Sequence, residues 1–106
     1  MQITTEIVTM KTVEHIGKDD FVRIVDSLEK NFHSKQVGFI DSKLLYNEKT
    51  DEWIIIQHWD CLENLHSASK KMFHNPITES YVKSLDPKSV KILVLPQLGV
   101  WDNKPI

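Results

Sequence analysis

The segment Trp53–Trp59 constrains the fold of this chain more than any other part of the sequence. Its residues, Trp-Ile-Ile-Ile-Gln-His-Trp, are typical of a β-strand, because β-branched and aromatic side chains favour a pleated surface. Asp60 ends the run, and the following residues up to His66 open an amphipathic helix. Trp53, Ile55 and Trp59 share one face of the strand. Ile54 and Ile56 occupy the other, so the sheet needs cover on both sides.

The remaining elements predict an α+β fold of the ferredoxin-like βαββαβ type. The second helix is expected to bury Leu62, Leu65, Ser69, Met72 and Phe73, and the first to take Asp19 as its N-cap. Both helices should cover one face of a four-stranded antiparallel sheet. We expect strands at 3–13, 37–46, 53–59 and 90–95, a hairpin loop at 47–52, and helices at about 19–32 and 60–73, with Asn75-Pro76 separating a shorter helical stripe over 77–85.

Length and composition predict a single domain over residues 1–106, with a C-terminal tail at 97–106. The net charge is −2 and the lysines are scattered, so we expect neither nucleic acid nor a membrane surface as a partner. The first residues lack the features of a signal peptide, and the longest apolar runs are too short to span a bilayer. The single cysteine, Cys61, fits a reducing compartment. The sequence therefore predicts a cytoplasmic protein.

The last strand repeats the pattern of the third, because Val90, Ile92 and Val94 alternate with Leu93 and Leu95. The chain has no third layer to cover the second apolar face, so we expect a homodimer in which the open sheet faces pack together. Residues 98–101 could reach across to the partner's sheet. The alternative is that this tail folds back over its own sheet as a lid, which would leave a monomer.

The strand ending in Trp59, the acidic cap after it, the Leu62-Glu-Asn-Leu65 helix opening and the Val37-Gly-Phe-Ile40 turn resemble the antibiotic biosynthesis monooxygenase family. The resemblance spans about residues 3–95. It implies a dimeric α/β barrel that oxidises polycyclic phenols or quinols with molecular oxygen, often without a cofactor. Related members bind and degrade haem, and the same fold hosts proteins without catalysis.

Carried over residue by residue, the resemblance is incomplete. Trp59 matches the strand-end Trp that lines the pocket of the haem-degrading branch. That branch also has an Asn in the first strand and a His on the second helix, whereas this chain has no Asn in 1–12 and places Ser69 near the histidine position. His66 is a turn early and His74 a turn late. The phenol-oxidising branch has an Asn where this chain has Ile55.

His66 is the candidate catalytic residue, because helical spacing places it at the edge of the apolar arc facing the sheet. There it could act as a general base or an axial ligand. The alternative is a core histidine bonded to a backbone carbonyl or to Ser69.

His58, His66 and His74 recur every eight residues, but no carboxylate joins them, so we expect no metal site. His15 and His33 end their elements and are expected to be solvated.

A pocket between sheet and helices is expected to be lined by Trp53, Gln57, Trp59, Met72, Phe73 and Tyr81. Alternatively, these aromatic residues simply fill the core. Gln57 must find a partner or a ligand inside a Trp/Ile strand. Cys61 lies at a helix N-terminus, where the dipole lowers a thiol pKa. The resemblance therefore implies a monooxygenase for a flat aromatic phenol or quinol, working without a cofactor. A ligand-binding or stress-response dimer without catalysis is the alternative, and a haem-binding protein the third.

Overall fold

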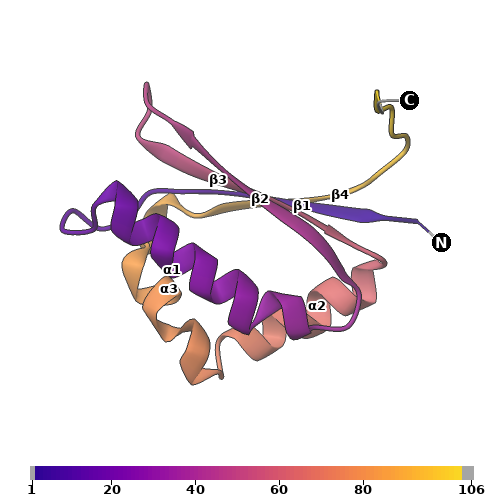
Figure 1. The fold of residues 1–106 in the computed structure, drawn as a ribbon, viewed down its shortest axis with the longest axis horizontal. Helices are drawn as coiled ribbons and strands as arrows, with labels where there is room; N and C mark the ends of the chain where they lie inside the picture. Colours follow the sequence, from indigo (N-terminus) through magenta and orange to yellow (C-terminus); the bar gives the residue numbers. More distant parts are fainter. Residues whose placement is uncertain (1, 104–106) are drawn as a thin grey trace.

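The computed structural model describes residues 2–103 and confirms the α+β ferredoxin-like plan. Residue 1 and residues 104–106, at the two ends of the predicted domain, lie outside the described residues. Figure 1 shows one sheet with all helices on the same side of it. The sheet order is β2-β3-β1-β4 with antiparallel neighbours throughout, formed by β1 (Thr4–Met10), β2 (Phe39–Asn47), β3 (Glu52–Trp59) and β4 (Lys91–Pro96).

Helix α1 (Lys18–Asn31) begins earlier than the sequence predicts. Its N-cap is Gly17, so the expected cap at Asp19 is wrong. Asp19 and Asp20 instead lie in the first turn, where their negative charges favour the helix dipole. Phe21, Val25 and Leu28 form the apolar stripe of α1 and are buried against the sheet.

Helix α2 (Leu62–Met72) buries a narrower face than expected. Leu65 and Ala68 are its buried residues, whereas Leu62 is exposed and Phe73, which follows the helix, is 74% exposed. The prediction that Leu62 and Phe73 are buried is therefore wrong. The break at Asn75-Pro76 is confirmed: a 3-10 turn (Pro76–Thr78) leads into α3 (Glu79–Ser84).

Strand β3 alternates strictly between the two faces of the sheet. Its helix-side residues Trp53, Ile55, Gln57 and Trp59 are buried, and they divide between two clusters. Trp53 and Ile55 belong to the larger core beneath α1 and α3. Trp59 belongs to a smaller core with Leu65 and Ala68 of α2.

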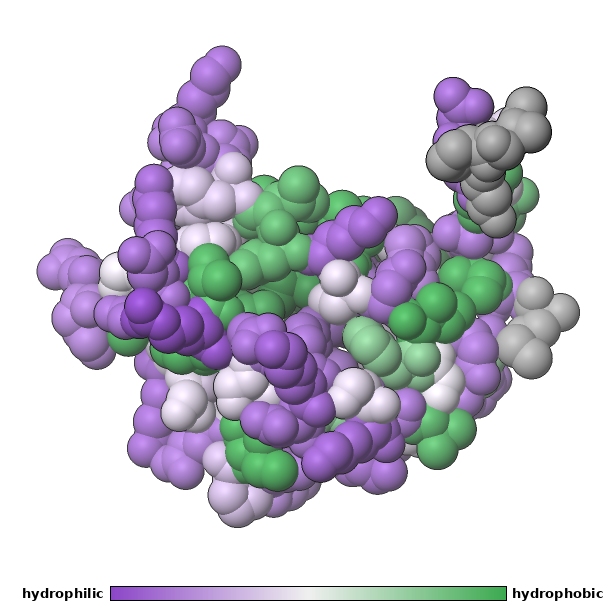
Figure 2. Space-filling view, viewed as in Figure 1, coloured by the Kyte–Doolittle hydropathy of each residue, from purple (hydrophilic) through white to green (hydrophobic). Residues whose placement is uncertain are grey.

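The opposite face of the sheet carries no helix, and hydrophobic side chains gather on it between hydrophilic ones (Figure 2). Register places Ile7 of β1 between Ile56 of β3 and Leu93 of β4 on this face. The tail does not form a lid over it, since Trp101 is 91% exposed and the described residues 97–103 extend away from the sheet (Figure 1). No helix within residues 2–103 is long and apolar enough to cross a membrane.

Candidate functional site

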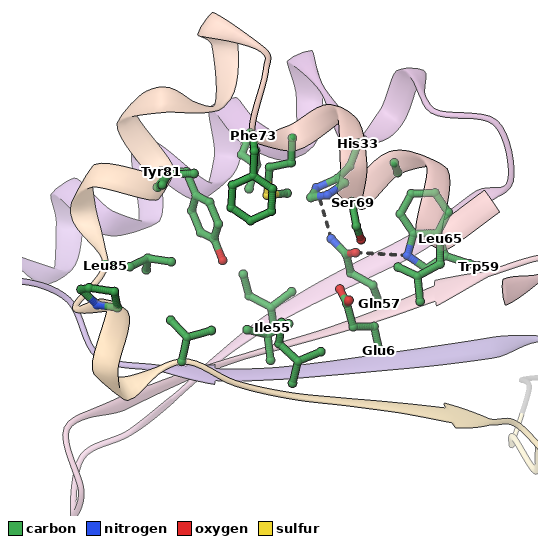
Figure 3. A pocket seen from close by; sticks show the side chains of 18 residues that line it. Glu6, His33, Ile55, Gln57, Trp59, Leu65, Ser69, Phe73, Tyr81 and Leu85 are labelled. Atoms are coloured by element: carbon green, nitrogen blue, oxygen red, sulfur yellow. Dashed lines mark hydrogen bonds between the residues drawn. The ribbon is translucent and has the colours of Figure 1, made fainter. Parts of the chain in front are cut away.

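A cavity of about 320 Å³ lies between the helix-covered face of the sheet and helices α2 and α3 (Figure 3). Most of its wall is apolar. The polar lining residues are Glu6, His33, Gln57, Ser69 and Tyr81, and the first four lie toward the Trp59 end of the cavity. An apolar cavity with a few polar groups placed at one end is the usual form of a small-molecule site.

Five residues predicted for the pocket do line this cavity: Gln57, Trp59, Met72, Phe73 and Tyr81. Trp53 does not. Its ring packs in the larger core, with its centroid 4.8 Å from that of Phe21 and 4.7 Å from that of Tyr46. It lies near the opposite end of β3 from Trp59, so it shares the sheet face without sharing the cavity.

The expected inward position of His66 is wrong. Its side chain is exposed and does not line the cavity. The buried residues Leu65 and Ala68 define the inward line of α2, and His66 falls on the flank of that line. The His66 imidazole acts on the cavity only through space, as a charge felt by Glu6.

His33, expected to be solvated, is instead 5% exposed and lines the cavity. It follows α1 in a 3-10 turn (His33–Lys35) that returns the chain toward β2. Its ring is stacked on Phe39 at a centroid distance of 5.8 Å and meets the edge of Trp59 at 6.0 Å. The signal that could have identified it is Glu29, because residues four apart on a helix face each other.

Glu29 is the centre of a hydrogen-bond network that fixes the polar end of the cavity. Ser42 Oγ and Gln57 Nε2 both donate to Glu29 Oε1, at 2.5 and 3.0 Å, and His33 Nδ1 contacts Oε2. Trp59 Nε1 donates to Gln57 Oε1 at 3.2 Å. An indole N–H can only donate, so it turns the Gln57 amide oxygen toward Trp59 and the amide nitrogen toward Glu29. The partner that Gln57 requires is thus present.

The network sets the protonation of the Glu29–His33 pair. Burial alone would raise the pKa of Glu29, but the hydrogen bonds from His33, Ser42 and Gln57 outweigh it and hold this pKa below its usual value. An ionised carboxylate only accepts, so His33 Nδ1 carries the proton between them. Nε2 is then the ring nitrogen without a hydrogen-bond partner among residues 2–103. A histidine oriented by a carboxylate in this way is suited to general base catalysis.

Glu6 is the second acidic group at this end. It lies on β1 opposite Gln57 of β3, and its carboxyl points toward the helices (Figure 3). Burial raises its pKa, and the nearby Glu29 adds to the effect while His33 and His66 oppose it. No hydrogen bond joins its side chain to any other part of residues 2–103.

Tyr81 faces the cavity from α3 as a neutral phenol. Burial raises its pKa far above the usual range, and its hydroxyl contacts Met10 Sδ at 3.3 Å.

The expected lowering of the Cys61 pKa is wrong. The Asn64 backbone N–H favours the thiolate, but desolvation and the Glu63 and Asp60 carboxylates together raise this pKa. Residues 2–103 contain no group of three or more His, Cys, Asp or Glu that could hold a metal ion.

No protein-family model matches this sequence, and no curated protein matches it either. Solved structures do match the fold. SnoaB, a cofactor-independent oxygenase from Streptomyces nogalater, is 14% identical with a TM-score of 0.63, covering 96% of this chain and 97% of its own. Rv0793 from Mycobacterium tuberculosis is 12% identical with a TM-score of 0.69, covering 94% and 99%. A candidate antibiotic biosynthesis monooxygenase from Chloroflexus aurantiacus is 15% identical with a TM-score of 0.63, covering 94% and 97%.

These similarities confirm the resemblance at the level of fold. The chain shares the α+β fold of these three structures, and the match extends over nearly its whole length. Because one fold can host many activities, the chemistry has to be argued from the cavity itself.

Proposed function

We propose that this protein is a monooxygenase that binds a flat aromatic phenol or quinol in the cavity and oxidises it with dioxygen, without a cofactor. The observation that carries the proposal is the buried His33, oriented by Glu29, at the polar end of an otherwise apolar cavity. The fold shared with a cofactor-independent oxygenase supports it.

In this proposal His33 Nε2 removes an acidic proton from the bound ring system, leaving a delocalised anion that is easily oxidised. The anion transfers electrons to dioxygen, and the two combine into a peroxide. When a ring methylene is the site of attack, loss of water leaves a carbonyl, so one oxygen atom stays on the product and the other departs in water. Trp59 and Leu65 exclude solvent from this end, since both are fully or almost fully buried.

Oxygen uptake by the pure protein with an anthrone or a quinol tests the proposal. The variants His33→Gln and Glu29→Gln should lower the rate, the first by about 10²–10⁴-fold because it removes the base. His74→Gln, on an exposed residue, is the matched control and should leave the rate unchanged. Uptake that stays at the buffer rate over a broad substrate panel would reject the enzyme and leave the ligand-binding dimer. Full activity of His33→Gln would reject the assigned base.

We further propose that the active form is a homodimer and that it works in the cytoplasm. The dimer is supported by the uncovered apolar sheet face, and the compartment by the single cysteine. The described tail residues, including Leu98 and Trp101, expose large apolar side chains that a partner could cover.

A further inference from the structure

The charge of the cavity limits what it can bind. Among its lining residues only Glu6, His33 and Tyr81 are ionisable, and no lysine or arginine is present. Tyr81 stays neutral. Any positive charge on His33 is offset by the negative charge of the Glu29 carboxylate that it contacts. The polar end therefore carries a net negative charge whenever Glu6 is ionised.

Glu6 differs from Glu29 in that its hydrogen-bonding capacity is unused. Glu29 accepts from Ser42, Gln57 and His33, whereas the Glu6 carboxyl has no such donor within residues 2–103. Three titratable groups act on the charge of Glu6: His33 in the turn after α1, Glu29 on α1 and His66 on α2. Its neighbours on the adjacent strands, Gln57 and Val94, are uncharged. A carboxylate partly withdrawn from water and without a partner loses some of its hydration, and a ligand that supplies a donor recovers that cost.

We infer that the ligand is a flat ring system carrying a protonated amine, and that this ammonium group binds the Glu6 carboxylate. The inference rests on the proposed function in that it places the substrate in the same cavity. A cation is the best partner for a half-buried carboxylate, since a charge-assisted hydrogen bond is about twice as strong as a neutral one. The aromatic carboxylates form the class that this cavity rejects, because they would bring a like charge to Glu6 and Glu29.

Three matched probes test the inference by calorimetry near neutral pH: naphthylmethylamine, naphthylmethanol and naphthoate. The wild-type protein should bind the amine at least about tenfold more tightly than the alcohol, a difference of about 1.4 kcal/mol, and naphthoate most weakly. Glu6→Gln should abolish the preference for the amine and strengthen naphthoate binding. Glu48→Gln, in the exposed hairpin loop, is the control and should keep the wild-type order.

Equal affinities for the three probes, failure of all three to bind, or an amine preference that survives in Glu6→Gln would each overturn the inference. The wild-type order alone decides it if the Glu6 variant does not fold. Oxygen uptake is measured separately, so the two proposals fail separately. An amine preference without uptake removes the oxygenase and keeps this inference, and uptake without an amine preference does the reverse.

Discussion

At the scale of single residues, Glu6 combines a functional position with a cost to stability. Its pKa is raised in the fold above the ordinary value of 4.5, so the folded protein binds more protons than the unfolded chain between these two values. The contribution of Glu6 to the free energy of unfolding therefore falls as pH rises through this window. Glu29 has the opposite sign: its pKa is lowered, so its contribution is present above 4.5 and is lost as pH falls through its folded pKa.

We predict that Glu6→Gln stabilises the protein at neutral pH and has little effect below pH 4.5, where Glu6 is protonated in both states. The gain should be at most about 1 kcal/mol, because a half-buried carboxylate keeps part of its hydration. Urea unfolding of the variant, the wild type and the Glu48→Gln control at neutral and acidic pH measures it. A Glu6→Gln protein less stable than wild type at neutral pH would contradict the account of Glu6 as an unpartnered carboxylate.

Sequence reasoning identified the need of Gln57 for a partner but not the partners themselves. A glutamine in an apolar strand must form hydrogen bonds when it is buried, and the sequence shows this directly. Glu29 and His33, in contrast, look like ordinary residues near the end of an amphipathic helix. Their burial depends on the turn after α1, which carries His33 back against Phe39 and Trp59. The prediction for His66 is wrong for a related reason. Helical spacing alone does not tell how wide the buried face of α2 is, and His66 lies just outside that face.

At the scale of elements, the strands were more predictable than the helix faces. The period of two in β3 leaves one choice of buried face, and the structure makes that choice without exception. Helix α2 is short and covers only the Trp59 end of the sheet. Only Leu65 and Ala68 of this helix are therefore buried, and its other apolar residues stay partly or fully exposed. Phe73 is left at the rim of the cavity as a result.

The turn between α2 and α3 depends on Thr78, which is 1% exposed. Its hydroxyl donates to the Asn75 carbonyl at 2.8 Å and also contacts the Met72 carbonyl at the end of α2. We predict that Thr78→Val lowers the free energy of unfolding by about 1–3 kcal/mol, because the Met72 carbonyl loses its donor, whereas the Asn75 carbonyl keeps the Thr78 backbone N–H. Binding of naphthylmethylamine should weaken as well, since Met72 and Phe73 line the cavity.

Chemical unfolding and calorimetry measure the two effects of Thr78→Val. The matched control is Thr50→Val in the exposed hairpin loop, which should change neither. A Thr78→Val protein with wild-type stability would show that the turn is held by Pro76 and the backbone alone.

At the scale of the whole molecule, the sheet is covered by helices on one side only. The other side presents large apolar residues of all four strands, with Leu45, Leu93 and Leu95 each about half exposed in the single chain. Full burial of a large apolar side chain is worth about 1.5–3 kcal/mol, so covering the exposed half of each contributes about half of that, and the sum over the face favours association of two copies. The alternation that creates this face was visible in the sequence, whereas the geometry of association depends on a second chain.

We predict that the wild-type protein has twice its chain mass of 12.4 kDa in solution at micromolar concentration, as measured by light scattering. Leu93→Lys should shift it to the monomer, because it places a charge at the centre of the buried face, and it should leave the fold intact because Leu93 is 57% exposed in one chain. Val22→Lys, a similarly exposed residue on the solvent side of α1, is the control and should remain dimeric. A wild-type protein that stays at 12.4 kDa would contradict the argument from the two-faced strands. If Leu93→Lys stays dimeric while the wild type is a dimer, the two copies meet through another surface, and the exposed tail around Trp101 becomes the next segment to test.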